Sequence, residues 1–253
     1  MSKSTLQIFQ KYADSLGPEQ IASPKALRII ERYVEKFVEE ISIGTRNNLE
    51  FHLKKLQQPT HSKRSEGVGA FVEIGAGIGT ITDLISTKIC NLVPKIPLIC
   101  YEVNDFCIEQ LYKNIDLDFT LIKNVDEIHS CNLGKRKTFL IIDEYISDSD
   151  TAFLLNQLIP RYVVIEGHRF RQRKAVAKSL LGKSITIRFF GNSIDSVKGA
   201  CVITVWGESR NVLTYLGYWR LILQSSLPVR KLLQAVGIKK RKFLNLFYRQ
   251  KFL

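Results

Sequence analysis

Three glycines stand within five positions in the segment FVEIGAGIGTITDLIS, residues 71–86. Gly75, Gly77 and Gly79 separate an apolar run typical of a buried strand from a segment with helical periodicity. Glycine adopts positive φ at little cost and allows the backbone to approach a ligand closely. A helix that begins at such a turn also directs its first amide N–H groups toward the ligand. The pattern therefore predicts a nucleotide cradle between a strand and a helix.

The spacing G-x-G-x-G differs from two common phosphate-binding patterns. The dinucleotide fingerprint is G-x-G-x-x-G, and a P-loop requires Gly-Lys-Ser/Thr after its glycines. Residues 71–86 contain neither pattern, so the turn predicts a ligand of another kind.

The rest of this region alternates between apolar runs and helical segments. Strands that alternate with helices form βαβ crossovers, and therefore a parallel sheet with helices on both faces. The connection between the last two strands is too short for a crossover, which predicts an antiparallel hairpin. The expected fold is α/β, a doubly wound, mostly parallel seven-stranded sheet that ends in an antiparallel hairpin. The predicted strands are 69–75, 96–103, 119–125, 137–145, 161–167, 185–191 and 199–207, and the predicted helices are 80–89, 105–114, 149–159 and 169–182.

Composition divides the chain into four parts. Apolar residues at helical spacing predict a helix over 23–41, with Ser23 as its N-cap, and a second helical stretch to about Gln58. The residues that follow are polar and rich in turn formers. The predicted parts are an N-terminal helical region 1–58, a linker 59–69, the sheet domain 70–208 and a basic helical C-terminal extension 209–253.

The positive charge of the chain is concentrated in this extension. Of a formal net charge of +13, ten Lys and Arg lie in residues 209–253, which contain no Asp or Glu. Apolar clusters alternate with the cations, so basic amphipathic helices are expected. Such helices could bind RNA, with Phe243, Phe247 or Tyr248 stacking on bases. They could instead bind an anionic membrane surface. In the third alternative, their apolar face docks on the sheet domain. RNA is favoured over the membrane surface.

Apolar segments and cysteines indicate the cellular compartment in which the chain is expected. The start of the sequence has no continuous apolar segment of the kind found in signal peptides, and no apolar run is long enough to span a membrane. The five cysteines are scattered and form no C-x-x-C pair, so we expect no disulfide partner and a reducing compartment. The chain is predicted to be cytoplasmic or peripheral to a membrane surface.

The order of strands and helices, with glycines after the first strand, resembles the class I S-adenosylmethionine-dependent methyltransferases. Residues 73–79, EIGAGIG, match the acidic-x-G-x-G-x-G motif of that family. Glu102 matches the acidic residue that ends its second strand. The resemblance covers roughly residues 68–208. It implies a Rossmann-like fold, S-adenosylmethionine as the cofactor and methyltransferase activity.

The resemblance also implies roles for single residues. The glycines would admit the methionine moiety, Glu73 would shape the turn, and Glu102 would accept both ribose hydroxyls. A residue after the third strand contacts the adenine amine in this family; Asp126 is expected to do so here, with Asn124 as the neighbouring candidate. The alternative for Asp126 is a helix N-cap. The predicted cofactor-binding residues are Glu73, Gly75, Ala76, Gly77, Gly79, Glu102, Val103, Asn124, Asp126 and Asp143.

The methyl acceptor is expected beyond the carboxyl ends of the fourth and fifth strands. Amino-directed adenine methyltransferases carry Asn/Asp-Pro-Pro-Tyr/Phe after the fourth strand, whereas this chain has DEYI at 143–146. The first half of the chain is similar to the ribosomal-RNA adenine dimethylases, but the missing prolines favour an oxygen acceptor. A hydroxyl group is a poor nucleophile until a base or a metal removes its proton.

Two arrangements could activate that hydroxyl. Asp143 and Glu166 occupy strand-end positions that resemble those where catechol-type O-methyltransferases hold magnesium, and their oxygens suit Mg²⁺. Alternatively, His168 acts as the general base, since histidine titrates near neutrality. For each residue the alternative is a purely structural role.

Four cations follow His168 and predict a basic rim that attracts an anionic acceptor. The alternative is a solvated basic helix face. The expected function is O-methylation of an anionic or polymer-bound acceptor, namely RNA or a nucleotide- or sugar-linked compound. Two further functions stay open: a non-catalytic nucleic-acid-binding module with a methyltransferase fold, and a Mg²⁺-dependent small-molecule O-methyltransferase. The predicted substrate-binding residues are Arg169, Arg171, Arg173 and Lys174.

Overall fold

The structure is a computed structural model that describes residues 3–15, 21–55, 69–92, 95–167, 169–190, 200–208 and 219. His168, most of the predicted linker and the C-terminal extension apart from Trp219 lie outside the described residues. No helix of the described ranges is both long enough and apolar enough to cross a membrane.

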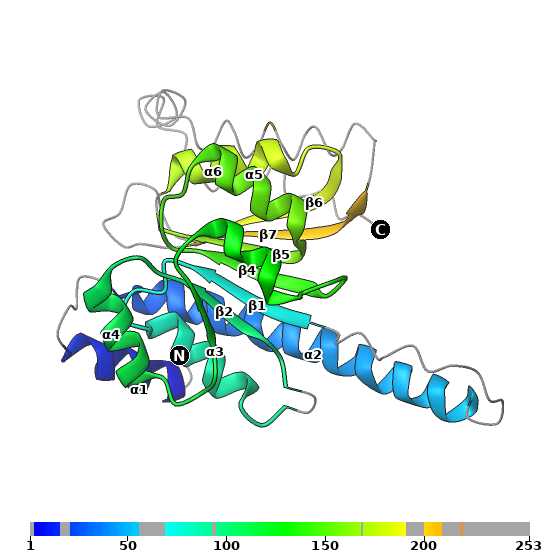
Figure 1. The fold of residues 1–253 in the computed structure, drawn as a ribbon, viewed down its shortest axis with the longest axis horizontal. Coiled ribbons are helices and arrows are strands. Elements are labelled where there is room, and N and C mark those ends of the chain that lie inside the picture. The colour runs from blue at the N-terminus through cyan, green and yellow to red at the C-terminus, as the bar shows by residue number, and fades with distance from the viewer. Residues whose placement is uncertain are drawn as a thin grey trace.

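A single seven-stranded sheet forms the centre of the molecule (Figure 1). Its strand order is β3-β2-β1-β4-β5-β7-β6, and β7 runs antiparallel to both of its neighbours while the other pairs are parallel. This confirms the predicted mostly parallel sheet that ends in an antiparallel hairpin. The strands are β1 Gly69–Ile74, β2 Leu98–Tyr101, β3 Thr120–Ile122, β4 Lys137–Ile142, β5 Ile159–Glu166, β6 Lys183–Phe190 and β7 Ala200–Glu208.

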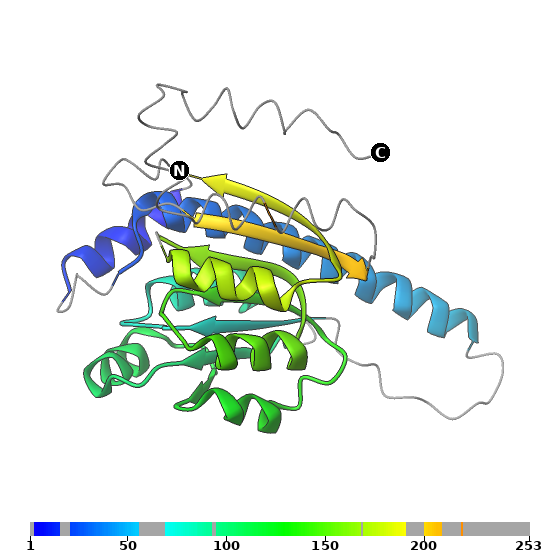
Figure 2. The same cartoon turned by 90° about the horizontal axis from the view of Figure 1, so that it is seen from above.

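Helices cover both faces of the sheet (Figures 1 and 2). Side chains alternate between the faces along each strand, so Phe71 packs on one side and Val72 on the other. The first side is covered by α1 Lys3–Ala13, α2 Pro24–Lys55, α3 Thr80–Ile89 and α4 Asp105–Asn114. The second side is covered by the 3₁₀ helix η2 Val125–Cys131, α5 Asp148–Gln157 and α6 Phe170–Ser179.

Local sequence explains where several helices begin. The Ser23 hydroxyl accepts a hydrogen bond from the Ala26 amide at 3.2 Å, as expected of the predicted N-cap. Asn104 caps α4 in the same way, and Ser147 caps α5. The two helical stretches predicted in the N-terminal region form one continuous helix, α2, instead of two.

Helix α2 lies across one face of the sheet and extends beyond it (Figure 1). Phe37 is fully buried, and its ring centroid lies 5.2 Å from that of Phe71 and 5.7 Å from that of Phe139. Beside this contact, the Glu40 carboxylate accepts hydrogen bonds from Arg161 and Tyr162 of β5. The N-terminal helices therefore share the hydrophobic core of the sheet.

Candidate cofactor-binding cavity

The glycine turn joins β1 to α3 with all three glycines in the left-handed region, at φ 82° for Gly75, 56° for Gly77 and 99° for Gly79. Gly75 also lies directly against the end of β4. A Cβ atom at Gly75 would stand 2.5 Å from the Cβ atom of Glu144, a distance that no ordinary contact reaches. Glycine is thus required at this position both by backbone conformation and by close approach.

We expect Gly75→Ala to destabilise the protein more than Gly167→Ala does. Gly167 also has a positive φ, of 65°, but no atom of the described residues lies within 4 Å of the Cβ that alanine would add. The control should cost about 1–2 kcal/mol for the left-handed conformation alone. Gly75→Ala should cost roughly 1 kcal/mol more because the turn must move away from Glu144. Denaturant unfolding of both variants measures the difference, and equal losses would mean that the close approach carries no cost.

Glu102 connects the glycine turn to the end of β2. Its Oε2 atom accepts a hydrogen bond from the Gly77 amide at 2.7 Å, and its Oε1 atom accepts from the amides of Val103 and Asn104, both at 2.9 Å. The side chain is only 5% exposed. Three amide donors hold this carboxylate in one orientation, so the two parts of the sequence motif meet as a single unit.

A cavity of about 350 Å³ opens at the carboxyl ends of the strands. Ligands of open α/β sheets bind at this edge. The glycine turn forms one wall, the loop after β2 another, and the ends of β4 and β5 a third. Its lining residues are Ile21, Gly75, Gly77, Glu102, Val103, Asn104, Cys107, Asp143, Glu144 and Arg169.

Glu73 lies beneath the turn, fully buried. Its Oε2 atom accepts a hydrogen bond from the Thr82 hydroxyl of α3 at 2.8 Å, while its Oε1 atom has no hydrogen-bond partner. Burial, and to a lesser extent the charge of Glu102, raises the pKa of Glu73 to about 8, although the Thr82 hydroxyl opposes the shift. Glu73 is therefore neutral near pH 7 and ties β1 to the helix that follows the turn.

Asp143 and Glu166 stand at the ends of the neighbouring strands β4 and β5. Glu166 is 2% exposed, and its Oε1 atom has no hydrogen-bond partner among the residues that the structure describes. Burial first, and then the charge of Glu166, raises the pKa of Asp143 well above its usual range. Arg169 opposes this effect, since its Nη2 atom donates to Asp143 Oδ1 at 2.9 Å. Burial and the neighbouring carboxylate thus favour the neutral form of the Asp143 carboxyl.

The described residues do not assemble a metal site. Among them, no group of three or more His, Cys, Asp or Glu side chains is placed to hold a metal ion. The predicted Mg²⁺ at Asp143 and Glu166 thus finds no support in this part of the chain. His168, the other predicted base, is outside the described residues.

Two predicted adenine contacts lie away from the cavity lining. Asn124 is exposed and stands before η2, where its backbone amide and its side chain both donate to Glu127. Asp126 is exposed in the first turn of η2 rather than at its cap. Neither residue lines the cavity described above. Their contact with a cofactor stays a prediction.

The four cations of the predicted basic rim lie in different environments. Arg169 lines the cavity, and Arg171 and Lys174 are exposed on α6. Arg173, however, is only 6% exposed and donates to the Gly167 carbonyl at 2.6 Å. Its guanidinium lies 5.3 Å from the ring centroid of Phe170. Arg173 is thus part of the packed interior and not of an exposed rim.

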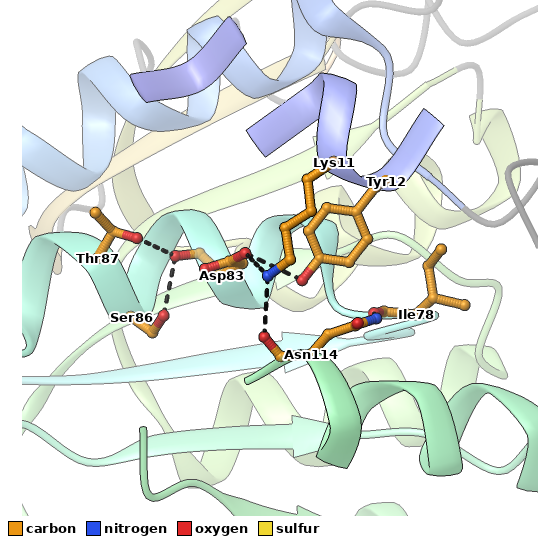
Figure 3. A network of polar contacts seen from close by, with 7 residues as sticks. All are labelled: Lys11, Tyr12, Ile78, Asp83, Ser86, Thr87 and Asn114. Atoms are coloured by element: carbon orange, nitrogen blue, oxygen red, sulfur yellow. Dashed lines mark hydrogen bonds and ion pairs between the residues drawn. The ribbon is translucent and has the colours of Figure 1, made fainter. Parts of the chain in front are cut away.

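The N-terminal helices also contribute to the site. Lys11 and Tyr12 of α1 both donate to the Asp83 carboxylate of α3, at 2.8 and 3.2 Å (Figure 3). Lys11 additionally donates to the Asn114 carbonyl at the end of α4, and the Asn114 amide donates to the Ile78 carbonyl inside the glycine turn. These bonds fix α1 on the elements that carry the turn.

Four lining residues were not predicted as site residues: Ile21, Asn104, Cys107 and Glu144. Ile21 precedes α2, 54 residues before Gly75, and nothing in its local sequence indicates that it lines a cavity. Asn104 and Glu144 each directly follow a predicted residue, Val103 and Asp143. The signal that could have found Glu144 is its place in the loop after a buried strand at the ligand-binding edge.

Solved structures resemble this chain at low sequence identity. No protein-family model matches this sequence, and no curated protein matches it. Among solved structures, precorrin-6y C5,15-methyltransferase from Geobacter metallireducens is 15% identical with a TM-score of 0.40, covering 56% of this chain and 83% of that one. An rRNA methylase from Streptococcus thermophilus is 9% identical with a TM-score of 0.40, covering 56% and 88%. The C-terminal domain of precorrin-6Y C5,15-methyltransferase from Rhodobacter capsulatus is 15% identical with a TM-score of 0.36, covering 57% and 83%.

The fold is assigned from the sheet itself. The order β3-β2-β1-β4-β5-β7-β6, the antiparallel β7 and the glycine turn after β1 give this chain a doubly wound α/β fold. A fold of this kind hosts many activities, so activity must be argued from the site.

Proposed function

We propose that this chain is an S-adenosylmethionine-dependent methyltransferase. The observation that carries the proposal is the bond from the Gly77 amide to Glu102, which joins the glycine turn and the strand-end carboxylate in the wall of one cavity. The positive φ of Gly75 and the close approach of Glu144 exclude any side chain at position 75. A turn that binds a ligand through its backbone needs such a glycine.

The residues present fit this cofactor. Glu102 is held by backbone amides, and its Oε2 atom, which accepts one amide where Oε1 accepts two, keeps acceptor capacity for a ribose hydroxyl. The cavity holds no Lys among its lining residues, which suits a nucleoside without phosphates. When bound, S-adenosylmethionine supplies a methyl group on a positively charged sulfur. The residues of this chain bind and orient it, and move the proton of the acceptor.

We further propose an oxygen acceptor that carries negative charge, RNA being the favoured class. Asp143 lines the cavity beside Arg169, and its carboxylate form could take up the proton of a hydroxyl. Arg169 orients the Asp143 carboxyl group. Arg171 and Lys174 are exposed on α6, the helix that follows Arg169, and would attract phosphate groups. The C-terminal extension adds ten further cations for the same partner.

Binding of S-adenosylhomocysteine to Glu102→Gln tests the cofactor site. Glutamine keeps the shape of the side chain but removes its charge and one acceptor, so charge-assisted hydrogen bonds of about 1.5–3 kcal/mol are lost. We expect the dissociation constant measured by titration calorimetry to rise about tenfold or more. Asp105→Asn is the matched control, because Asp105 is exposed on α4 and does not line the cavity.

Two results would contradict the proposal. The first is a folded wild-type protein that does not bind S-adenosylhomocysteine, which would end the methyltransferase assignment. The second is unchanged affinity in Glu102→Gln, which would move the cofactor elsewhere. Transfer of a labelled methyl group to RNA, followed by nuclease digestion and mass spectrometry, identifies the acceptor atom. Cofactor binding without transfer to RNA, glycans or small molecules would favour a non-catalytic nucleic-acid-binding module.

A further inference from the structure

The charges around the cavity do not balance. Among the described residues that line it, Glu102, Asp143 and Glu144 carry carboxyl groups, and Arg169 is the one cation. Arg169 is already bound to Asp143 at 2.9 Å, so its charge is used within the site. A cavity walled by one sign of charge concentrates ligands of the other sign. The lining therefore favours a positively charged ligand.

Glu144 is the carboxylate in this group that lacks a partner. Glu102 accepts three backbone amides, and Asp143 accepts Arg169. In contrast, no hydrogen bond or ion pair joins the Glu144 carboxylate to any residue that the structure describes. Burial and the charge of Glu102 both raise the pKa of Glu144, against a smaller opposing effect of Arg169. A half-buried, unpartnered carboxylate is costly, and a cation in the cavity would relieve that cost.

The side chain of Glu144 also starts at the cradle. A Cβ at Gly75 would meet Glu144 Cβ at 2.5 Å and Glu144 N at 2.9 Å, so the two residues are in direct backbone contact. Glu144 lines the cavity together with Gly75, Gly77 and Asp143. It thus stands between the glycine turn, where the methionine moiety of the proposed cofactor would lie, and the ends of β4 and β5.

We infer that Glu144 contacts the cationic centre of the cofactor and makes the cavity select S-adenosylmethionine over S-adenosylhomocysteine. This inference rests on the proposed function. In methyl transfer an oxygen lone pair of the acceptor would form the new bond to the methyl carbon, the acceptor's proton would pass to Asp143, and the electron pair of the broken carbon–sulfur bond would stay on sulfur, so the product has lost the positive charge. Glu144 therefore binds the reactive form more tightly than the spent form and favours release of the product.

The test compares three ligands by titration calorimetry: S-adenosylmethionine, S-adenosylhomocysteine and sinefungin, in which a protonated amine stands at the sulfonium position. We expect the wild-type protein to bind the two cations about tenfold more tightly than the neutral product. In Glu144→Gln the affinity for both cations should fall about tenfold, while the affinity for S-adenosylhomocysteine stays within about twofold. Asp148→Asn is the control, since Asp148 is exposed at the start of α5 and outside the cavity.

The outcomes separate the two proposals. Retained product affinity shows that Glu144→Gln is folded, so selective loss of the cations supports the inference. Equal loss for all three ligands, or no loss for any, overturns it while leaving the proposed function intact. Failure of the wild-type protein to bind any of the three ligands overturns the proposed function, and the inference with it. Selectivity that also fades as ionic strength rises would give independent support, because salt screens a partly exposed charge.

Discussion

Replacing Phe37 with alanine is expected to lower the free energy of unfolding by about 3–5 kcal/mol. Phe37 belongs to α2 but is fully buried against Phe71 and Phe139, which lie on the two central strands β1 and β4. Truncation would leave a cavity in the main core, since close packing on three sides limits how far the neighbours can collapse. Guanidinium unfolding followed by circular dichroism measures the loss.

The control for Phe37→Ala is the same change at Phe106, a residue of α4 that is 42% exposed. It should cost much less, within about 1 kcal/mol, because little packed surface is removed. A single cooperative transition that shifts as a whole in Phe37→Ala would show that the N-terminal helices and the sheet unfold together. Two transitions, with the sheet transition unmoved, would contradict that description of the core.

Replacing Glu73 with glutamine is expected to change the pH dependence of stability. The folded-state pKa of Glu73, about 8, lies above the ordinary value of 4.5, because burial disfavours the charged form. The stability that the protonated group contributes is therefore complete below pH 4.5 and is lost as the pH rises to about 8. Over that window the wild-type protein should lose about 1.4 kcal/mol per pH unit relative to the variant.

Denaturant unfolding of both proteins at several pH values between 5 and 9 measures this difference. Glutamine can still accept the Thr82 hydroxyl hydrogen bond, so the variant should keep the tie between β1 and α3. Glu109→Gln, an exposed position on α4, is the control and should follow the wild-type profile. Parallel profiles for wild type and Glu73→Gln would mean that Glu73 is ionised in the folded protein.

The fold could be predicted from the sequence because strands and helices alternate with a clear period. The predicted limits of α3 and α4, 80–89 and 105–114, match the structure residue for residue, since glycines or a capping Asn104 precede them. The strand β2 is shorter than predicted at both ends, spanning Leu98–Tyr101 instead of 96–103, and the two residues after it, Glu102 and Val103, line the cavity. Local pattern cannot tell an apolar residue in a strand from one in the loop that follows.

The candidate site was predictable where one motif carries it and not where the tertiary fold assembles it. Gly75, Gly77 and Glu102 meet as expected because parallel strands place their carboxyl ends at one edge. Ile21 reaches the cavity only through the path of the N-terminal helices over the sheet, which no local pattern encodes. The burial of Arg173 was not predicted, because it depends on contacts that form only in the folded protein. The Gly167 carbonyl and the Phe170 ring interact with its guanidinium, whereas the basic sequence around it suggests a solvated side chain.

The position of α2 on the sheet has a consequence for how the chain folds. The Glu40 carboxylate of this helix pairs with Arg161, 121 residues later in the sequence. During synthesis the apolar side chains of α2 therefore stay unpacked until β4 and β5 have left the ribosome. Contacts between residues far apart in the sequence slow folding, and apolar surface is exposed to solvent until they form. We expect nascent chains that end before β5 to bind chaperones through α2, and chains that include β5 to be released.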